Sequence, residues 1–157
     1  MKLKHRNGRA ALVAPEQVSA AADRYFAGWN AHDADAVAAA FSPTGLWRDI
    51  GGSFVLHGRA AIRDAAAGYI DALGDLHVTV ARKIRQGEHV ACEWHATAVH
   101  AAPLWGFQPA GRTVEFYGCT VFRVGPSGLI ETDTNYWDVN GLRQQLTEGE
   151  ESTSPAS

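Results

Sequence analysis

Residues 76–100 read LHVTVARKIRQGEHVACEWHATAVH, and this stretch contains the pattern that determines the fold. Two runs, 76–85 and 90–100, are rich in Val, Thr and Trp and follow a period of two residues, which is typical of β-strands. Gln86 and Gly87 leave room only for a tight turn between the runs. The sequence therefore predicts an antiparallel hairpin here.

A second pair of strands follows the first. Residues 112–124 and 129–138 have the same strand pattern, and Pro126, Ser127 and Gly128 form a tight connection between them. The junction between the two pairs, residues 101–111, is much longer and contains Trp105 and Phe107. Long loops in compact domains often line ligand sites, so we expect this loop to border one.

The segment before these strands has a helical period. Pro15 begins a predicted helix, Asp33 caps a short second one that ends at residues 43–45, and residues 58–73 form a third. A brief strand, residues 46–49, precedes the third helix. The apolar stripe of the first helix consists of Val18, Ala22, Tyr25 and Trp29.

This order of elements predicts an α+β domain. Three helices must cover one face of a mostly antiparallel sheet. Helices this short do not fill the concave side of a twisted sheet, so we expect a pocket between the two layers. The folded domain is expected over residues 15–146, with an N-terminal tail at 1–14 and an acidic, Ser-rich disordered tail at 147–157.

Composition narrows the classes of function. The formal net charge of -3 is spread over scattered charged residues, which argues against nucleic-acid binding. No stretch is long and apolar enough for a membrane span or a secretory leader, so we expect a cytoplasmic protein. Cys92 and Cys119 lack CxxC spacing, the histidines lack paired spacing, and no glycine-rich phosphate loop occurs. We therefore expect neither a metal nor a cofactor.

Several motifs carry a family resemblance. They are YFAGWNAHD at 25–33, WRD at 47–49, HGRAAIR at 57–63, EW at 93–94, PLWG at 103–106, PAGR at 109–112 and YWD at 136–138. Together they resemble SnoaL-like polyketide cyclases, within the superfamily of nuclear transport factor 2, ketosteroid isomerase and scytalone dehydratase. The resemblance implies a cone-shaped α+β barrel in which a curved, mostly antiparallel sheet wraps over three helices.

The resemblance assigns roles position by position. Tyr25 matches the tyrosine with which ketosteroid isomerases bind the substrate oxyanion, and Asp49 matches their proton-abstracting aspartate. Their protonated aspartate corresponds to Thr120. The acid/base aspartate of the SnoaL-like cyclases corresponds to Asn135, and their supporting histidine also corresponds to Thr120. Asparagine exchanges no proton near neutral pH. The resemblance therefore supports a shared fold more strongly than a shared reaction.

Side chains alternate between the two faces of each strand, and this alternation together with the resemblance defines the expected site. The expected catalytic residues are Asp49 as base, Tyr25 as oxyanion donor, and His95 with Asp133 for the second proton. The expected substrate-binding residues, all placed toward the pocket, are Trp47, Glu93, Trp105, Phe116, Thr120, Asn135 and Trp137.

Each assignment has a simpler alternative. Asp49 could pair with Arg48 or Arg63 at the rim, and Tyr25 could be a core residue. A register slip of one residue would turn His95 outward and Trp94 inward. Glu93 or Asp133 could serve only as an ion-pair partner of Arg112 or Arg123.

The sequence thus supports two functions. The first is a cofactor-independent acid/base enzyme that isomerises, cyclises or dehydrates a small hydrophobic carbonyl compound, polycyclic or polyketide-like. The second is a non-catalytic binding or scaffold module of the same fold. Under either function we expect a homodimer, formed through an exposed sheet face with Val90, Cys92 and Trp94.

Overall fold

The strands form one curved, open sheet in the computed structural model, which describes residues 12–151. Within these residues the sheet has six strands in the order β2-β1-β6-β5-β4-β3. All neighbours pair antiparallel except β1 and β6, which are parallel. The predicted α+β class with a mostly antiparallel sheet is confirmed. The strands are β1 (Phe41–Asp49), β2 (Phe54–His57), β3 (Leu73–Gln86), β4 (His89–His100), β5 (Thr113–Val124) and β6 (Ile130–Trp137).

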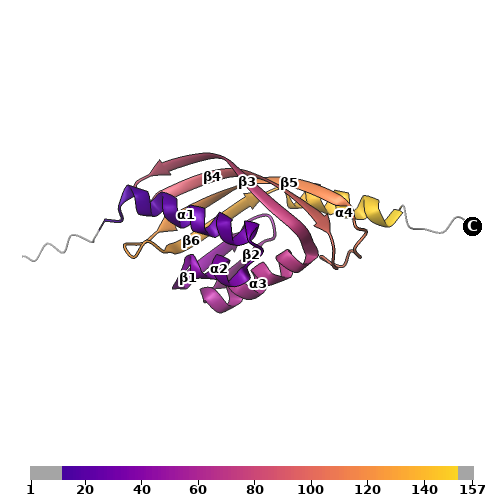
Figure 1. Ribbon diagram of the computed structural model, residues 1–157, viewed down its shortest axis with the longest axis horizontal. Coiled ribbons are helices and arrows are strands. Elements are labelled where there is room, and N and C mark those ends of the chain that lie inside the picture. Colours follow the sequence, from indigo (N-terminus) through magenta and orange to yellow (C-terminus); the bar gives the residue numbers. More distant parts are fainter. Residues whose placement is uncertain (1–11, 152–157) are drawn as a thin grey trace, which may run out of the picture.

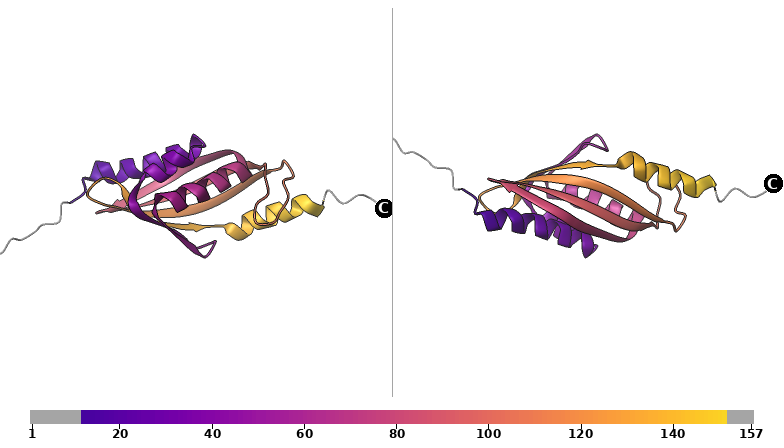
Figure 2. Two further views of the ribbon diagram at one scale, coloured as in Figure 1. Left: turned by 90° about the horizontal axis from the view of Figure 1, so that it is seen from below. Right: turned by 90° about the horizontal axis from the view of Figure 1, so that it is seen from above.

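Three helices pack against the inner side of the sheet: α1 (Pro15–Asn30), α2 (Ala34–Ala39) and α3 (Gly58–Ala72). Figure 1 shows α1 below β4 and α2 and α3 beside β1, and Figure 2 shows the sheet curling around α3. The bounds of α1 and α3 agree closely with the helices that the sequence predicts, whereas α2 ends earlier than expected. In the described part of the chain, no helix has the length and apolar character needed to cross a membrane.

A fourth helix, α4 (Val139–Glu151), was not predicted. Asp138 accepts a hydrogen bond from the Gly141 amide at its start, and Leu142 and Leu146 are buried. The helix covers residues 147–151, which we expected in the C-terminal tail. The remainder of that tail, 152–157, and residues 1–11 of the N-terminal tail lie outside the described residues.

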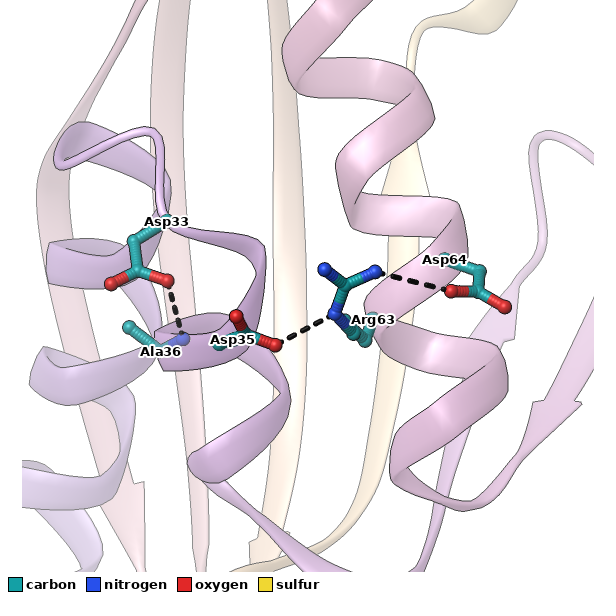
Figure 3. Close-up of polar contacts among 5 residues, drawn as sticks. All are labelled: Asp33, Asp35, Ala36, Arg63 and Asp64. Atoms are coloured by element: carbon teal, nitrogen blue, oxygen red, sulfur yellow. Dashed lines mark hydrogen bonds and ion pairs between the residues drawn. The ribbon is translucent and has the colours of Figure 1, made fainter.

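Polar contacts join α2 to its neighbours (Figure 3). Asp33 caps α2 as predicted, because its Oδ1 accepts a 2.9 Å hydrogen bond from the Ala36 amide. On α3, Arg63 pairs with Asp35 at 2.7 Å and with Asp64 at 3.4 Å. These pairs are exposed and add little stability. They do show that Arg63 has partners other than Asp49.

The start of β1 differs from the prediction. Residues 43–45 were expected to end the second helix, but they lie inside β1, which already begins at Phe41. The pairing of β1 with β6 shifts between Phe41 and Leu46, so the Pro43 and Gly45 segment forms an irregularity of the strand. The short edge strand β2 was not predicted either.

For most strands, the face that was predicted to point inward does so. On β1, Trp47 and Asp49 are buried on the inner face, with 3% of each residue exposed. Strands β5 and β6 also have the predicted faces inward. Their inner-face residues that matter for the pocket are Phe116, Gly118, Thr120, Asp133, Asn135 and Trp137.

The predicted parity of β4 is wrong. Val90, Cys92, Ala96 and Ala98 are buried, and Trp94 lines the pocket, so the opposite set faces outward. The physical reason is the strand's own alternation, since one face is apolar except at the buried His100 and the other carries Glu93, His95 and Thr97. Val90, Cys92 and Trp94 therefore cannot form the exposed face that we expected for dimerisation.

Gly118 marks the tightest packing on the inner face. A Cβ at this position would lie 2.7 Å from the Cβ of Trp137 and still closer to the indole of Trp94. The absence of a side chain thus allows the two indoles to approach each other across β5.

We predict that Gly118→Ala destabilises the protein by about 1–3 kcal/mol, because the two indoles must move to admit a methyl group. Gly68→Ala on α3 is the matched control. A Cβ there meets nothing within 4 Å, and alanine favours the helix. Urea unfolding of both variants measures the difference. Equal stability of the two variants would contradict the packing account.

Candidate functional site

An aromatic pocket lies between α1, α3 and the inner face of the sheet. Its volume is about 540 Å³, including the part open to solvent. Aromatic rings form most of the wall, and the polar groups on it are few, as in many small-molecule sites. The lining residues are Tyr25, Phe26, Trp29, Trp47, Asp49, Tyr69, Leu73, Leu76, Val78, Trp94, Phe116, Thr120, Asn135 and Trp137.

Asp49 is the acidic group on the pocket wall. The indole nitrogen of Trp137 donates to both of its carboxylate oxygens, at 3.1 Å and 2.9 Å. The Gly52 amide donates to Oδ1 at 2.6 Å, across the turn after β1. All these partners are pure donors, so they match an ionised carboxylate. The alternative pairing with Arg48 or Arg63 does not occur, and Asp49 lines the pocket as predicted.

A chain of hydrogen bonds crosses the inner face beside Asp49. The Trp94 indole donates to Thr120 Oγ1 at 2.9 Å, Thr120 donates to Asn135 Oδ1 at 2.6 Å, and Asn135 Nδ2 donates to Asp133 Oδ1 at 2.6 Å. The indole nitrogen of Trp94 can only donate and Asn135 Oδ1 can only accept, so the Thr120 hydroxyl accepts from the indole and donates to the amide oxygen. This fixes the orientation of the Asn135 amide, and the chain ends on Asp133.

Asp133 has no exposed surface and lies behind the pocket wall. Its burial raises its pKa well above the ordinary value; the Tyr25 hydroxyl opposes this increase and the charge of Asp49 adds to it. Burial, followed by the charge of Asp133, raises the pKa of Tyr25 well above its ordinary value. Asp133 therefore favours the neutral acid and Tyr25 the neutral phenol.

The register of β1 and β6 arranges four site residues in a rectangle. Trp47 lies opposite Asp133, and Asp49 lies opposite Asn135. Parallel neighbours are about 5 Å apart, and alternate residues of one strand are about 7 Å apart. Two carboxyl groups thus occupy diagonal corners, with the donor-bound Asp49 on the pocket wall and the buried Asp133 behind it.

Tyr69 is a site residue that the sequence analysis missed. It lines the pocket from α3, and its pKa is raised to about 12 by burial and by the charge of Asp49. Its place in the apolar stripe of α3 suggested only a core role. The hydroxyl group was the one available hint, since a buried tyrosine usually needs a polar partner.

Trp105 from the long loop stands beside this tyrosine. Its ring centroid is 6.3 Å from that of Tyr69 and 6.0 Å from that of Trp137, and Arg143 of α4 lies 4.9 Å from its ring centroid. The loop therefore contacts two residues of the pocket wall, although Trp105 does not itself line the pocket.

Two expected site residues lie on the outer face instead. His95 stacks on Tyr117 with ring centroids 4.6 Å apart and is 3.4 Å from Glu115, while Glu93 is 3.5 Å from Arg82. The sheet separates both from the pocket, so His95 cannot form the predicted dyad with Asp133. Asp133 instead bonds to Asn135 of its own strand.

The arrangement can perform proton transfer. It offers a carboxylate acceptor on the pocket wall, the phenol of Tyr25, and a neutral acid behind that phenol. Over residues 12–151, His, Cys, Asp and Glu side chains do not gather in groups of three or more that could hold a metal ion.

Comparison with known proteins agrees with this fold. The family model described as SnoaL-like polyketide cyclase matches residues 19–146. Among curated proteins, none matches the chain significantly. Several solved structures share the fold at low sequence identity.

A putative SnoaL-like polyketide cyclase from Jannaschia sp. CCS1 has a TM-score of 0.77 and 17% identity, over 90% of this chain and 97% of that one. AclR, a putative hydroxylase from Streptomyces galilaeus, has a TM-score of 0.75 and 20% identity, over 86% and 87% of the two chains. An epoxide hydrolase like the LEH type, from M. tuberculosis, has a TM-score of 0.67 and 20% identity, over 87% and 94%.

We predict that Asp133→Asn removes a pH dependence of stability. Above pH of about 4 the unfolded chain releases the Asp133 proton, whereas the folded protein keeps it because its pKa is raised. In this window the free energy of unfolding falls as pH rises, by up to about 1.4 kcal/mol per pH unit from this group. Urea unfolding from pH 4 to 8 should show a shallower fall in the variant than in the wild type. Identical slopes would contradict a neutral buried Asp133.

Proposed function

The chain belongs to the SnoaL-like polyketide cyclase family, and from this membership we propose that it is a cofactor-independent acid/base enzyme. Its substrate is a small hydrophobic carbonyl compound, polycyclic or polyketide-like, and its reaction is an isomerisation, a cyclisation or a dehydration. The observation that carries the proposal is Asp49, a carboxylate held only by donors on the wall of an aromatic pocket.

The first step is removal of a proton from the carbon beside the substrate carbonyl. The C–H bond breaks, the proton goes to Asp49 Oδ2, and the electron pair moves to the carbonyl oxygen, which becomes an enolate. Oδ2 has one hydrogen bond and Oδ1 has two, so Oδ2 keeps more capacity to accept the proton. Trp137 and Gly52 hold the carboxylate in place for this step.

Tyr25 and Asn135 are the proposed donors to the developing enolate oxygen. Both line the pocket. Asn135 has two N–H groups; its amide donates to Asp133 and also interacts with the Tyr25 hydroxyl, so the two proposed donors lie side by side. The raised pKa of Tyr25 keeps its phenol protonated and able to donate.

The second proton transfer is assigned to Tyr25 backed by Asp133. The sequence suggested His95 with Asp133, but His95 lies on the outer face. A neutral carboxyl behind the phenol can supply a proton through it, either to a second carbon in an isomerisation or to a leaving hydroxyl in a dehydration. This role is consistent with the raised pKa of Asp133.

The structural relatives do not select the reaction. Their names include a cyclase, a hydroxylase and an epoxide hydrolase, and their sequence identities to this chain lie between 17% and 20%. One fold supports several chemistries through different side chains on the same positions. The choice among isomerisation, cyclisation and dehydration therefore depends on the substrate.

A non-catalytic binding module is the second candidate. It is favoured by Asn135 and Thr120, which occupy the positions where the resemblance places the acid/base residues of the cyclases. In this case Asp49 and the hydrogen-bond chain would orient a ligand without transferring a proton.

Deuterium exchange separates the two candidates. With polycyclic ketones in heavy water, we predict that the wild type exchanges protons beside the carbonyl and that Asp49→Asn reduces the rate by about 100-fold or more, because an amide cannot accept the proton. Asp71→Asn, which changes an exposed carboxylate of α3, should leave the rate unchanged. Mass spectrometry follows the exchange.

Binding must be measured in the same experiment. If ketones raise the melting temperature of the wild type but none exchanges, the enzymatic proposal fails and the binding module is the better account. An Asp49→Asn variant that exchanges at the wild-type rate would exclude Asp49 as the base.

We also propose a homodimer through the outer face of the sheet, with residues other than those expected from the sequence. Tyr117 and Tyr136 are 54% and 51% exposed there and lie on neighbouring strands. Such exposed aromatic rings are typical of interfaces.

Tyr136→Arg should convert the dimer to a monomer in sedimentation velocity, since it buries a charge in the interface. Asp71→Arg on α3 is the control and should remain dimeric. A wild type that sediments as a monomer at high concentration would refute this proposal.

A further inference from the structure

Four of the five indole N–H groups have a polar partner. Trp94 donates to Thr120, and Trp137 donates to Asp49. The hydrogen-bonding interactions of Trp29 and Trp105 lower the pKa values of Tyr25 and Tyr69, respectively. The remaining indole, that of Trp47, has a buried nitrogen without a hydrogen-bond partner.

An unpartnered N–H in this position is costly. Trp47 is 3% exposed, so water does not compensate the group, and buried donors are nearly always paired in folded proteins. An acceptor is close in the register, because Asp133 lies opposite Trp47 and its Oδ2 also lacks a hydrogen bond. The two groups nevertheless do not bond to each other. The N–H is therefore not used within the protein, although its ring lines the pocket.

The position of Trp47 fits a role in binding a substrate oxygen. It precedes Asp49 by two residues on β1, and both side chains lie on the inner face about 7 Å apart along the strand. A carbonyl oxygen bound near Trp47 would direct the adjacent carbon toward Asp49. Tyr25 interacts with Asp133, the residue opposite Trp47.

We propose that the indole N–H of Trp47 binds the substrate's carbonyl oxygen, as a third donor beside Tyr25 and Asn135. This inference rests on the proposed function and adds a requirement to it. The ligand must carry an oxygen acceptor on an otherwise apolar ring system, and hydrocarbons of the same shape bind more weakly.

The probes are 1-tetralone and tetralin, which have nearly the same shape and differ by the carbonyl oxygen. Nitrogen-15 NMR resolves the indole N–H signals of the wild type, and Trp47→Phe identifies the signal of Trp47 by its loss. We expect 1-tetralone to shift this proton downfield, as a new hydrogen bond does, and tetralin to leave it nearly in place.

Affinity measurements supply the second readout. In the wild type 1-tetralone should bind more tightly than tetralin, because Trp47, Tyr25 and Asn135 all donate to its oxygen. Trp47→Phe should reduce this preference by about fivefold to tenfold, the factor expected for one hydrogen bond, even if the smaller ring weakens the binding of both probes. Asp49→Asn should keep the preference, because it leaves the indole intact.

The outcomes distinguish this inference from the proposed function. Exchange of ketone protons without a shift of the Trp47 signal overturns the role of Trp47 and keeps Asp49 as the base. A Trp47 proton that is shifted upfield in the free protein and does not respond to the ketone also overturns it, because the N–H then rests on the Trp29 ring. A shift without exchange supports Trp47 as a binding group and refutes catalysis. Failure of both probes to bind contradicts both proposals.

Discussion

The site depends on one constraint, which is that polar groups buried on the inner face of the sheet must find partners there. Trp94, Thr120, Asn135 and Asp133 meet it with a single chain of hydrogen bonds across β4, β5 and β6. The chain begins at an indole, which can only donate, and each later member accepts from the one before it. It requires the three strands to keep their register, and it requires Gly118, which lets the flanking indoles approach. The packing around Gly118 and the chain of hydrogen bonds thus both hold β4, β5 and β6 in their register.

The chain ends on Asp133, and this explains why two carboxyl groups so close in the fold behave differently. Asp49 receives hydrogen bonds only from N–H groups, which match a carboxylate, whereas Asp133 is fully buried and its pKa is raised. Pairs of acids whose environments separate their protonation states are a recurring basis of acid/base catalysis. Here the neutral acid lies behind a phenol and the carboxylate lies on the pocket wall.

Much of this could be predicted from the sequence. On β1, β5 and β6 the resemblance, extended along each strand by its period of two, correctly placed Asp49, Thr120 and Asn135 inward. The error on β4 arose from following the resemblance instead of the strand's own pattern, in which the face with Trp94 is apolar except at His100. The role of Tyr69 could not be predicted, because helical periodicity places a tyrosine in the core without saying where its hydroxyl lies. The helix α4 was missed because its sequence is polar, and among its described side chains only Val139, Leu142 and Leu146 are buried.

The central claim is that Asp133 is a neutral acid and Asp49 a carboxylate in the same folded protein. Infrared difference spectroscopy at neutral pH tests it directly through the carbonyl stretch of a protonated carboxylic acid. The account predicts that the wild type has this band, that Asp133→Asn lacks it, and that Asp49→Asn retains it. A band that disappears only in Asp49→Asn, or a wild type without the band, would contradict the account.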